Sequence, residues 1–201
     1  HVTGWGKTAP DYSHKNLRFI SCDITNSESV ANAWETTSAF HPQVDFLVNN
    51  AGFGYFSMLQ DFDEAKFREM WEVNMLGAFL VSKAVAPSMI AAQSGHILNI
   101  SSIAGRVGAA WGAGYNSSKW ALTGFSESMF QELRPKGIKV TTVYPGSTHT
   151  HFFDEIPGAG STDFMLDPQE LAEMMVNVMN TSPNFLVREI EMRPLNSKPI
   201  K

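Results

Sequence analysis

Apolar segments typical of strands alternate with longer amphipathic segments typical of helices along most of the chain. Parallel strands need long crossover connections, usually helices, so this alternation predicts a parallel sheet. The expected strands are Leu17–Cys22, Val44–Val48, His96–Ser102, Ile138–Tyr144 and Phe185–Met192, and the expected helices are Thr25–Phe40, Asp61–Gln93, Ala113–Leu133 and Asp167–Asn180. The sequence therefore predicts an α/β fold, with a doubly wound parallel sheet and helices on both faces, in a single domain over residues 1–201.

Two of the predicted helices begin with recognisable capping residues. Thr25 and Glu28 have the spacing of a capping box, in which each side chain binds the backbone N–H of the other residue. Asp167 is an N-cap candidate, and Pro168 behind it is the residue favoured at the first helical position. These residues predict where the two helices start.

Polar or turn-forming residues stand at the ends of four predicted strands, namely Asp23, Asn49, Ser102 and Pro145. The carboxyl ends of parallel strands meet at one edge of a sheet, and doubly wound sheets bind their ligands there. We therefore expect these residues to lie near one another, around a ligand site.

The segment Tyr115-Asn116-Ser117-Ser118-Lys119 places a phenol and an ammonium four residues apart, on one face of a predicted helix. A tyrosine normally titrates near pH ~10, and a nearby cation stabilises the phenolate and lowers its pKa. Ser102 offers a hydroxyl at a strand end, where it can meet a substrate oxygen. Together these groups suggest acid–base chemistry on a carbonyl or an alcohol.

Other motifs occur along the chain in a fixed order: Asn49-Asn50-Ala51-Gly52, then Asn74, Ser102, Tyr115 with Lys119, and Pro145-Gly146 leading to Thr150. With these motifs, the region from about Leu17 to about Pro194 resembles the short-chain dehydrogenase/reductase family. The resemblance implies a Rossmann-like domain that binds NAD or NADP. It also implies hydride transfer between a carbonyl and an alcohol, with a small-molecule substrate.

The resemblance assigns catalytic roles to four residues. Tyr115 would be the general acid in reduction and the general base in oxidation, and Lys119 would lower its pKa and bind the nicotinamide ribose. Ser102 would polarise the substrate carbonyl; Ser101 is its competitor, but successive strand residues face opposite ways. Asn74 would hold a water that links the lysine to solvent, with a satisfied buried amide as the alternative.

The remaining matched residues would contact the cofactor. Asp23 corresponds to the residue that binds the adenine amino group, and Thr150, after Pro145 and Gly146, to the one that binds the nicotinamide carboxamide. Asn49, Ala51 and Gly52 would form the cofactor-side segment, where glycine permits close approach. Asn50 is equally consistent with cofactor contact and with a structural hydrogen bond between strands.

The first 16 residues lack the glycine-rich phosphate turn with which family members open. One interpretation takes Val2-Thr3-Gly4 as the end of the family's first strand, and the other is a true truncation. In both, the charge after the second strand that separates NAD from NADP would be missing. Two alternatives stay open: a non-catalytic binding protein on the same fold, supported by the absent turn, and a 3-oxoacyl-thioester reductase.

Composition restricts the classes of partner that the protein could bind. The net charge is −5 and no Lys/Arg cluster occurs, which argues against nucleic-acid binding. The single cysteine fits a cytoplasmic location. The apolar stretch 75–92 carries Lys83 and Pro87 and is interpreted as a buried helix, with no membrane span. His149 and His151 lack further ligands at a diagnostic spacing, so we predict no metal site.

Aromatic residues border the expected pocket and imply a substrate with an apolar part: Phe53, Tyr55, Trp111, Phe152, Phe153 and Phe164. The glycine-containing loop 149–166 is expected to close over cofactor and substrate. The helices at 61–93 and 113–133 carry more apolar residues than one sheet face can cover, so we expect a homodimer or homotetramer, as in the family.

Overall fold

A computed structural model of the chain describes residues 1–150, 152 and 164–195. The strands are β1 Val2–Gly6, β2 Leu17–Ser21, β3 Phe46–Asn49, β4 Gly95–Ile100, β5 Ile138–Pro145 and β6 Glu189–Met192. The helices are α1 Ser27–Phe40, α2 Glu64–Trp71, α3 Ala78–Ala92, α4 Ala113–Leu133 and α5 Pro168–Met179. Short 3-10 turns occur at Leu59–Asp61, Ile103–Gly105 (η3) and Arg134–Lys136.

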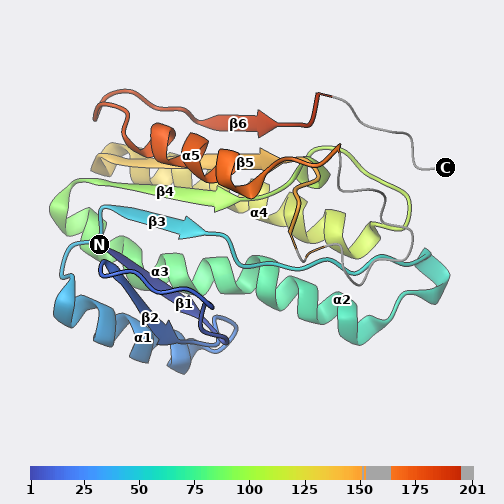
Figure 1. Ribbon diagram of the computed structural model, residues 1–201, viewed down its shortest axis with the longest axis horizontal. Coiled ribbons are helices and arrows are strands. Elements are labelled where there is room, and N and C mark those ends of the chain that lie inside the picture. The colour runs from blue at the N-terminus through green and yellow to red at the C-terminus, as the bar shows by residue number, and fades with distance from the viewer. Residues whose placement is uncertain (151, 153–163, 196–201) are drawn as a thin grey trace.

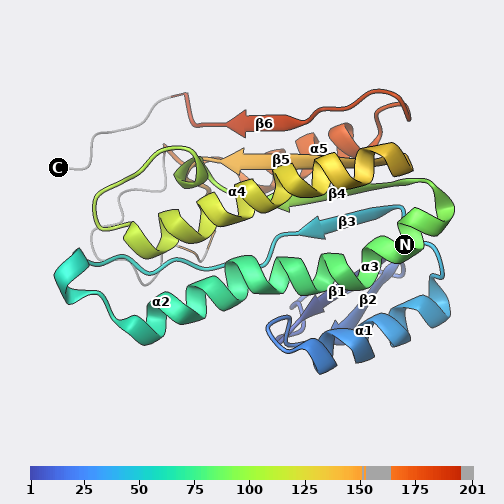
Figure 2. The same ribbon diagram turned by 180° about the vertical axis from the view of Figure 1, so that it is seen from behind.

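The predicted parallel α/β architecture is confirmed. Strands β3, β4, β5 and β6 form a parallel sheet in that order. Figure 1 shows α5 over one face of this sheet, and Figure 2 shows α3 and α4 over the other, with α2 beyond the carboxyl ends of the strands. The carboxyl ends of the strands share one edge, so they can present side chains to a common site.

The interpretation of Val2-Thr3-Gly4 as the end of the first strand is wrong. Strand β1 runs parallel to β2, with Val2 opposite Leu17, and the described residues show no pairing between β1 and β3. In the usual order of a doubly wound sheet, 3-2-1-4, the first strand lies beside the fourth and the second beside the third. Strand β1 therefore occupies the position of the second strand in a doubly wound sheet. Lys7 is the residue that directly follows β1.

The core lies between the sheet and the helices α1, α3 and α4. Ile97 and Val140 supply it from β4 and β5, Met89 from α3 and Val30 from α1. Each large apolar side chain buried in this way contributes about 1.5–3 kcal/mol to folding. Helix α3 packs with both α1 and β3, so it joins the β1–β2 pair to the larger sheet.

The helix start predicted at Thr25 is displaced by one residue. Thr25 donates both its N–H and its hydroxyl to Asp23 Oδ1, at 3.0 and 2.7 Å, so this hydroxyl serves the preceding turn. Asn26 is the N-cap instead, and its Oδ1 accepts from Ser29 N at 2.9 Å. The predicted Asp167 cap is confirmed, because its side chain accepts from Gln169 N.

The long helix expected at 61–93 begins at Glu64, behind the N-cap Asp63, and contains a π-helical segment at Glu72–Gly77. π-Helical segments are rare in proteins, but many of those that occur lie at functional sites. The continuous helix Glu64–Ala92 is long and apolar enough to cross a membrane by length and composition alone, although α3 also packs on β3 and β4. By itself this is weak support for a membrane span.

Candidate active site

Helix α4 and the end of β4 bring together three of the residues assigned to catalysis. Tyr115 and Lys119 lie one turn apart in α4, with only 9% and 4% of their surfaces exposed. The Lys119 ammonium lies 5.8 Å from the centre of the Tyr115 ring and donates to the Ile100 carbonyl of β4 at 2.9 Å. Ser102 follows β4, and its side chain lies close enough to that of Tyr115 to influence the pKa of the phenol. The predicted cluster of hydroxyl, phenol and ammonium is therefore present.

The electrostatics of this cluster differ from the prediction. Burial raises the pKa of Tyr115 to about 12, and the Ser102 side chain opposes that shift. Burial also lowers the pKa of Lys119 to about 8. The prediction of a Tyr115 pKa lowered by Lys119 is wrong for this structure, because desolvation dominates and the ammonium faces the ring and the Ile100 carbonyl. Tyr115 is consequently protonated at neutral pH and ready to donate.

The two serines at the end of β4 have different hydrogen-bond partners, as expected because successive strand residues face opposite ways. Ser101 is buried, and its hydroxyl donates to the Lys119 carbonyl at 3.1 Å and contacts the Thr123 hydroxyl at 3.1 Å. Ser102 Oγ accepts from Ala104 N at 3.1 Å, which caps the η3 turn. The Ser101 hydroxyl is thus used to fix the turn to α4, and Ser102 is the serine that meets Tyr115.

Asn74 lies in the π-segment and is 1% exposed. Its Nδ2 donates to the Phe53 carbonyl at 3.0 Å and to Ser118 Oγ at 2.9 Å. Gly52, beside Phe53, is so close that a Cβ there would lie 2.9 Å from Asn74 Oδ1 and 3.3 Å from Lys119 Nζ. The amide is therefore satisfied, as the alternative reading held, and it fixes the segment that includes Ala51 and Gly52 next to Lys119.

Asn49 has a side chain that is used inside the protein. Its Nδ2 donates to Ser82 Oγ at 2.9 Å and to Asn99 Oδ1 at 2.7 Å, and Asn99 in turn donates to Ser126 Oγ at 2.8 Å. This buried chain of hydrogen bonds joins β3, α3, β4 and α4. The geometry favours a structural role for Asn49 over the cofactor contact expected for it, whereas Asn50 is exposed.

Asp23 lies at the end of β2, as expected, but most of its carboxylate is already in use. Besides the two bonds from Thr25, its Oδ2 forms a 2.9 Å ion pair with Lys7. The hydrogen bonds from Thr25, and then that from Lys7, lower the pKa of Asp23 to about 2. The sequence did not identify Lys7 as a site residue, because its position beside β2 depends on strand pairing and not on a motif.

Pro145 ends β5, and Gly146 N donates to the Met192 carbonyl of β6 at 2.7 Å. Thr150 Oγ1 accepts from Phe152 N at 3.3 Å, and His149 N donates to the Leu166 carbonyl at 2.9 Å. The rest of the loop expected to close over the site, including His151, Phe153 and 154–163, lies outside the described residues.

Two aromatic rings pack directly on Tyr115. The rings of Phe152 and Phe56 have their centres 5.3 and 5.4 Å from the centre of the Tyr115 ring. Phe56 was missed, although residues 52, 54 and 56 alternate along one segment and period 2 predicts a shared side. Tyr55 instead contacts Phe62, at 5.3 Å.

The other expected pocket aromatics that the structure describes are Trp111, Phe53 and Phe164. Trp111 is 59% exposed, and its described contact is a backbone bond from Ser57 N. Phe53 contributes its backbone to Asn74, and Phe164 is half-buried beside the start of α5. An apolar wall at Tyr115 is therefore made by Phe56 and Phe152.

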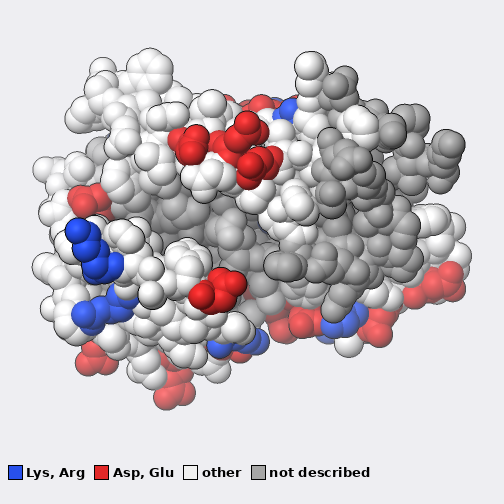
Figure 3. Space-filling model, viewed as in Figure 1, with Lys and Arg blue, Asp and Glu red and all other residues white. Residues whose placement is uncertain are grey.

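Figure 3 shows acidic side chains gathered over α5, where Asp167, Glu170 and Glu173 are exposed. Among the described residues, no group of three or more His, Cys, Asp or Glu side chains is arranged to hold a metal ion.

Comparisons with known proteins identify the family. The family model for short chain dehydrogenases matches residues 6–159. An oxidoreductase of Botryotinia fuckeliana is 37% identical over 131 residues, which cover 65% of this chain and 48% of that protein. A 3-oxoacyl-[acyl-carrier-protein] reductase of Vibrio cholerae is 34% identical over 187 residues, covering 89% of this chain and 77% of that protein. The chain thus spans about half the length of the first of these relatives.

A solved structure shares the fold. An alcohol dehydrogenase from the archaeon Thermococcus sibiricus, complexed with 5-hydroxy-NADP, has a TM-score of 0.83 and 29% sequence identity. The matched region covers 91% of this chain and 77% of that one.

Proposed function

Because the chain belongs to the short-chain dehydrogenase family, we propose that it is an NAD(P)-dependent oxidoreductase that interconverts a carbonyl and an alcohol. The observation that carries the proposal is the cluster of Ser102, Tyr115 and Lys119 at the carboxyl edge of the sheet. All three side chains are buried, and a buried phenol beside a hydroxyl and an ammonium suits proton transfer to a carbonyl oxygen.

The residues present fit a nicotinamide dinucleotide. A side chain at Gly52 would meet Asn74 Oδ1 at 2.9 Å and Lys119 Nζ at 3.3 Å, so glycine lets this segment lie directly against the Lys119 ammonium that would bind the nicotinamide ribose. An ammonium has three donors, and the described bond to the Ile100 carbonyl uses one of the Lys119 donors, which leaves others for ribose hydroxyls. When bound, the dinucleotide supplies or accepts the hydride.

The protein's own groups handle the proton and the carbonyl. Tyr115, with a pKa raised to about 12, holds its proton at neutral pH and donates it to the substrate oxygen during reduction. Ser102 donates a hydrogen bond to the same oxygen and polarises it. Phe56 and Phe152 cover Tyr115 and exclude water, which strengthens these hydrogen bonds.

Lys7 supports a preference for NADP. It follows β1 and lies 2.9 Å from Asp23 at the carboxyl edge of the sheet. In doubly wound sheets, the residue in this region that meets the adenine ribose is acidic for NAD, whereas a nearby cation accommodates the 2′-phosphate of NADP. An ammonium at this position therefore favours the phosphorylated cofactor.

The substrate is proposed to be a small carbonyl compound or alcohol with an apolar part, because Phe56 and Phe152 line the phenol. The Vibrio cholerae relative favours a second candidate, reduction of a 3-oxoacyl thioester. The proposal also includes a cytoplasmic enzyme that needs neither membrane nor nucleic acid. It works as a homodimer or homotetramer through α2, α3 and α4.

Turnover of the Tyr115→Phe variant tests the proposal. NADPH or NADH oxidation is followed with a panel of apolar ketones and a 3-oxoacyl thioester, and Tyr55→Phe serves as a control, since its ring packs on Phe62 away from Tyr115. We expect Tyr115→Phe to lower kcat by about 10²–10⁴-fold while the melting temperature changes little. Retained activity would refute the role of Tyr115. Cofactor binding without turnover of any carbonyl by the unmodified protein would favour the non-catalytic alternative.

A further inference from the structure

The Ser102 turn, residues 102–107, is held by α4 on one side. Asn116, the residue after Tyr115, donates from Nδ2 to the Ala104 carbonyl at 3.0 Å and to the Val107 carbonyl at 2.7 Å. Ser102 itself caps the turn by accepting from Ala104 N. The backbone that carries the Ser102 hydroxyl is thus tied to the helix that carries Tyr115.

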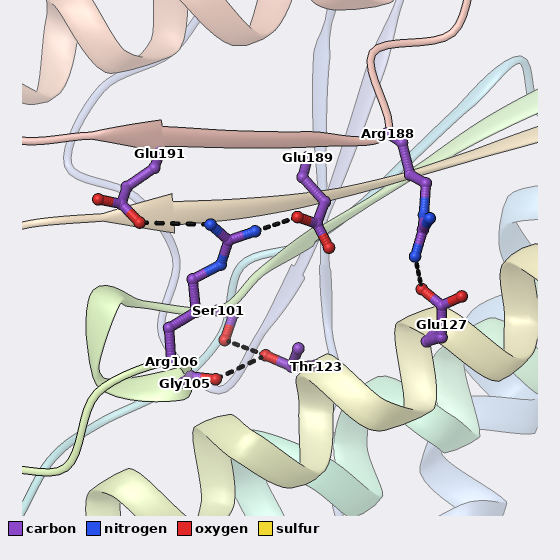
Figure 4. Close-up of polar contacts among 8 residues, drawn as sticks. All are labelled: Ser101, Gly105, Arg106, Thr123, Glu127, Arg188, Glu189 and Glu191. Atoms are coloured by element: carbon purple, nitrogen blue, oxygen red, sulfur yellow. Dashed lines mark hydrogen bonds and ion pairs between the residues drawn. The ribbon is translucent and has the colours of Figure 1, made fainter.

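Arg106 holds the same turn from the opposite side, as Figure 4 shows. Its guanidinium extends to β6 and forms ion pairs with Glu189 and, at 3.4 Å, with Glu191. The two carboxylates are two residues apart and so lie on one face of the strand. The guanidinium carbon also lies 3.8 Å from the centre of the Tyr144 ring, and Tyr144 is fully buried in β5. One side chain therefore connects the turn after β4 to both β5 and β6.

We propose that Arg106 is a positioning residue for catalysis, which holds the Ser102 hydroxyl at the distance from Tyr115 that proton transfer requires. The inference rests on the proposed function. The other described side-chain hydrogen bonds to the turn come from α4, namely those of Asn116 and that of Thr123 Oγ1 to the Gly105 carbonyl at 3.4 Å. Without Arg106 the turn would lose its ion pairs with β6 and could shift with respect to the sheet. A displacement of the Ser102 hydroxyl by a fraction of an ångström would weaken its contact with the substrate oxygen and with the phenol.

The geometry suits arginine better than lysine. A planar guanidinium can stack on an aromatic ring and present several N–H donors in one plane, whereas an ammonium is a point charge. Arg106 uses both properties at once, on Tyr144 and on the two glutamates. Glu191 also pairs with Arg193 at 2.6 Å, so its carboxylate is held by a second arginine.

The chain offers a matched control in Arg188. It precedes β6, forms an ion pair with Glu127 of α4, and lies 5.2 Å from the centre of the Phe130 ring. Arg188 therefore makes the same two kinds of contact as Arg106, but with residues more than two turns along α4 from Tyr115. Removing it removes a comparable surface contact without touching the Ser102 turn.

The test compares Arg106→Met, Arg106→Lys and Arg188→Met in the full protein, with the carbonyl substrate and dinucleotide of the unmodified enzyme. We expect Arg106→Met to lower kcat by about ten- to a hundredfold, with the KM for the dinucleotide nearly unchanged. Arg106→Lys should recover part of the loss. Arg188→Met should leave kcat within about twofold of the unmodified enzyme, although both arginine-to-methionine changes should shift melting by similar amounts.

A pH profile separates positioning from stability. In alcohol oxidation the acidic limb of kcat reports the general base, and the Ser102 side chain lowers the pKa of Tyr115. Arg106→Met should move that limb to higher pH, and Arg188→Met should not. The double variant Glu189→Gln/Glu191→Gln removes the partners of Arg106 instead, and it should reproduce the changes in kcat and in the pH profile. It serves as the test if Arg106→Met folds poorly.

Two results would overturn the inference: an Arg106→Met enzyme with unaltered kcat and pH profile, or equal losses of kcat in Arg106→Met and Arg188→Met that follow stability. Failure of the proposed function is distinct, because the unmodified protein would then show no turnover at all.

Discussion

The side chain of Asn74 binds both backbone polar atoms of Phe53: Oδ1 accepts from Phe53 N at 3.0 Å, and Nδ2 donates to the Phe53 carbonyl at 3.0 Å. These residues are 21 positions apart, on the π-segment and on the segment after β3. The pairing imitates the hydrogen bonds of a neighbouring strand, and it fixes a stretch of chain that is itself neither helix nor strand.

Replacing Asn74 by leucine should therefore affect both stability and turnover. The change leaves the Phe53 N–H and carbonyl without their buried partner, and we expect the free energy of unfolding to fall by about 2–3 kcal/mol. Turnover should slow, because Gly52 beside Lys119 is no longer fixed. Urea unfolding and steady-state kinetics measure the two effects.

Asn50→Leu is the control for that variant, because Asn50 is exposed in the same segment. It should change neither quantity appreciably. If Asn74→Leu lowered stability but left turnover unchanged across pH, Asn74 would be a structural residue alone.

Lys7→Ala should change the choice of dinucleotide. Loss of the ammonium removes the partner expected for the 2′-phosphate, so we predict about a tenfold weaker Kd for NADPH, equal to ~1.4 kcal/mol, with little change for NADH. Titration calorimetry or nicotinamide fluorescence in the full protein measures both constants. Lys15→Ala, also at an exposed position, is the control. Equal weakening for both dinucleotides would show that Lys7 acts only through Asp23.

His96 makes the protein sensitive to acid, for a reason remote from catalysis. It is 1% exposed in β4. Thr141 Oγ1 donates to the Val187 carbonyl at 2.5 Å, so it accepts from His96 Nε2 at 2.7 Å, and His96 Nδ1 is buried without a partner among the described residues. Burial, and then the nearby Lys139 charge, lower the pKa of His96 to about 4.

A lowered pKa means that the folded state binds this proton more weakly than the unfolded state, whose histidine titrates near 6.5. The free energy of unfolding therefore keeps its full value above pH 6.5 and decreases as the pH falls towards about 4. We expect a loss of about 2 kcal/mol over that window. His96→Gln keeps a donor for Thr141 and should flatten the pH dependence, while His14→Gln, at an exposed position, should not. Identical slopes in all three proteins would contradict the assignment.

The apolar surface of α2, α3 and α4 should carry a subunit contact. Phe67, Trp71, Leu76 and Phe79 are each 37–39% exposed, and Trp120 of α4 is 52% exposed. A patch of this kind on a water-soluble protein marks an interaction surface. Light scattering should show a dimer or tetramer, and Trp120→Lys should shift it towards monomer. A monomeric unmodified protein would overturn this prediction.

The sequence was sufficient for the strand and helix alternation and for the positions of Ser102, Tyr115 and Lys119, because both depend on short-range spacing. It was insufficient for properties that tertiary packing determines. The pKa of Tyr115 follows from burial under Phe56 and Phe152, and the place of Lys7 follows from the pairing of β1 with β2.

The direction of the Asn49 side chain shows the same limit. An asparagine at a strand end can face a ligand or the interior, and the hydroxyl of Ser82, 33 residues away, decides the matter. No local pattern contains that information. The predicted capping box at Thr25 failed for a similar reason, since Asp23 takes the Thr25 hydroxyl.

Strands β1 and β3 each pair on one side only within the described part of the chain. An unpaired edge presents a row of N–H and C=O groups to which another strand can add, and this is a route to aggregation. On β3 the side chains of Phe46 and Val48 are also 44% and 38% exposed. We therefore expect the 201-residue chain on its own to associate edge to edge as its concentration rises. A measurement of its solubility, made before any assay of turnover, would report whether another segment covers these edges.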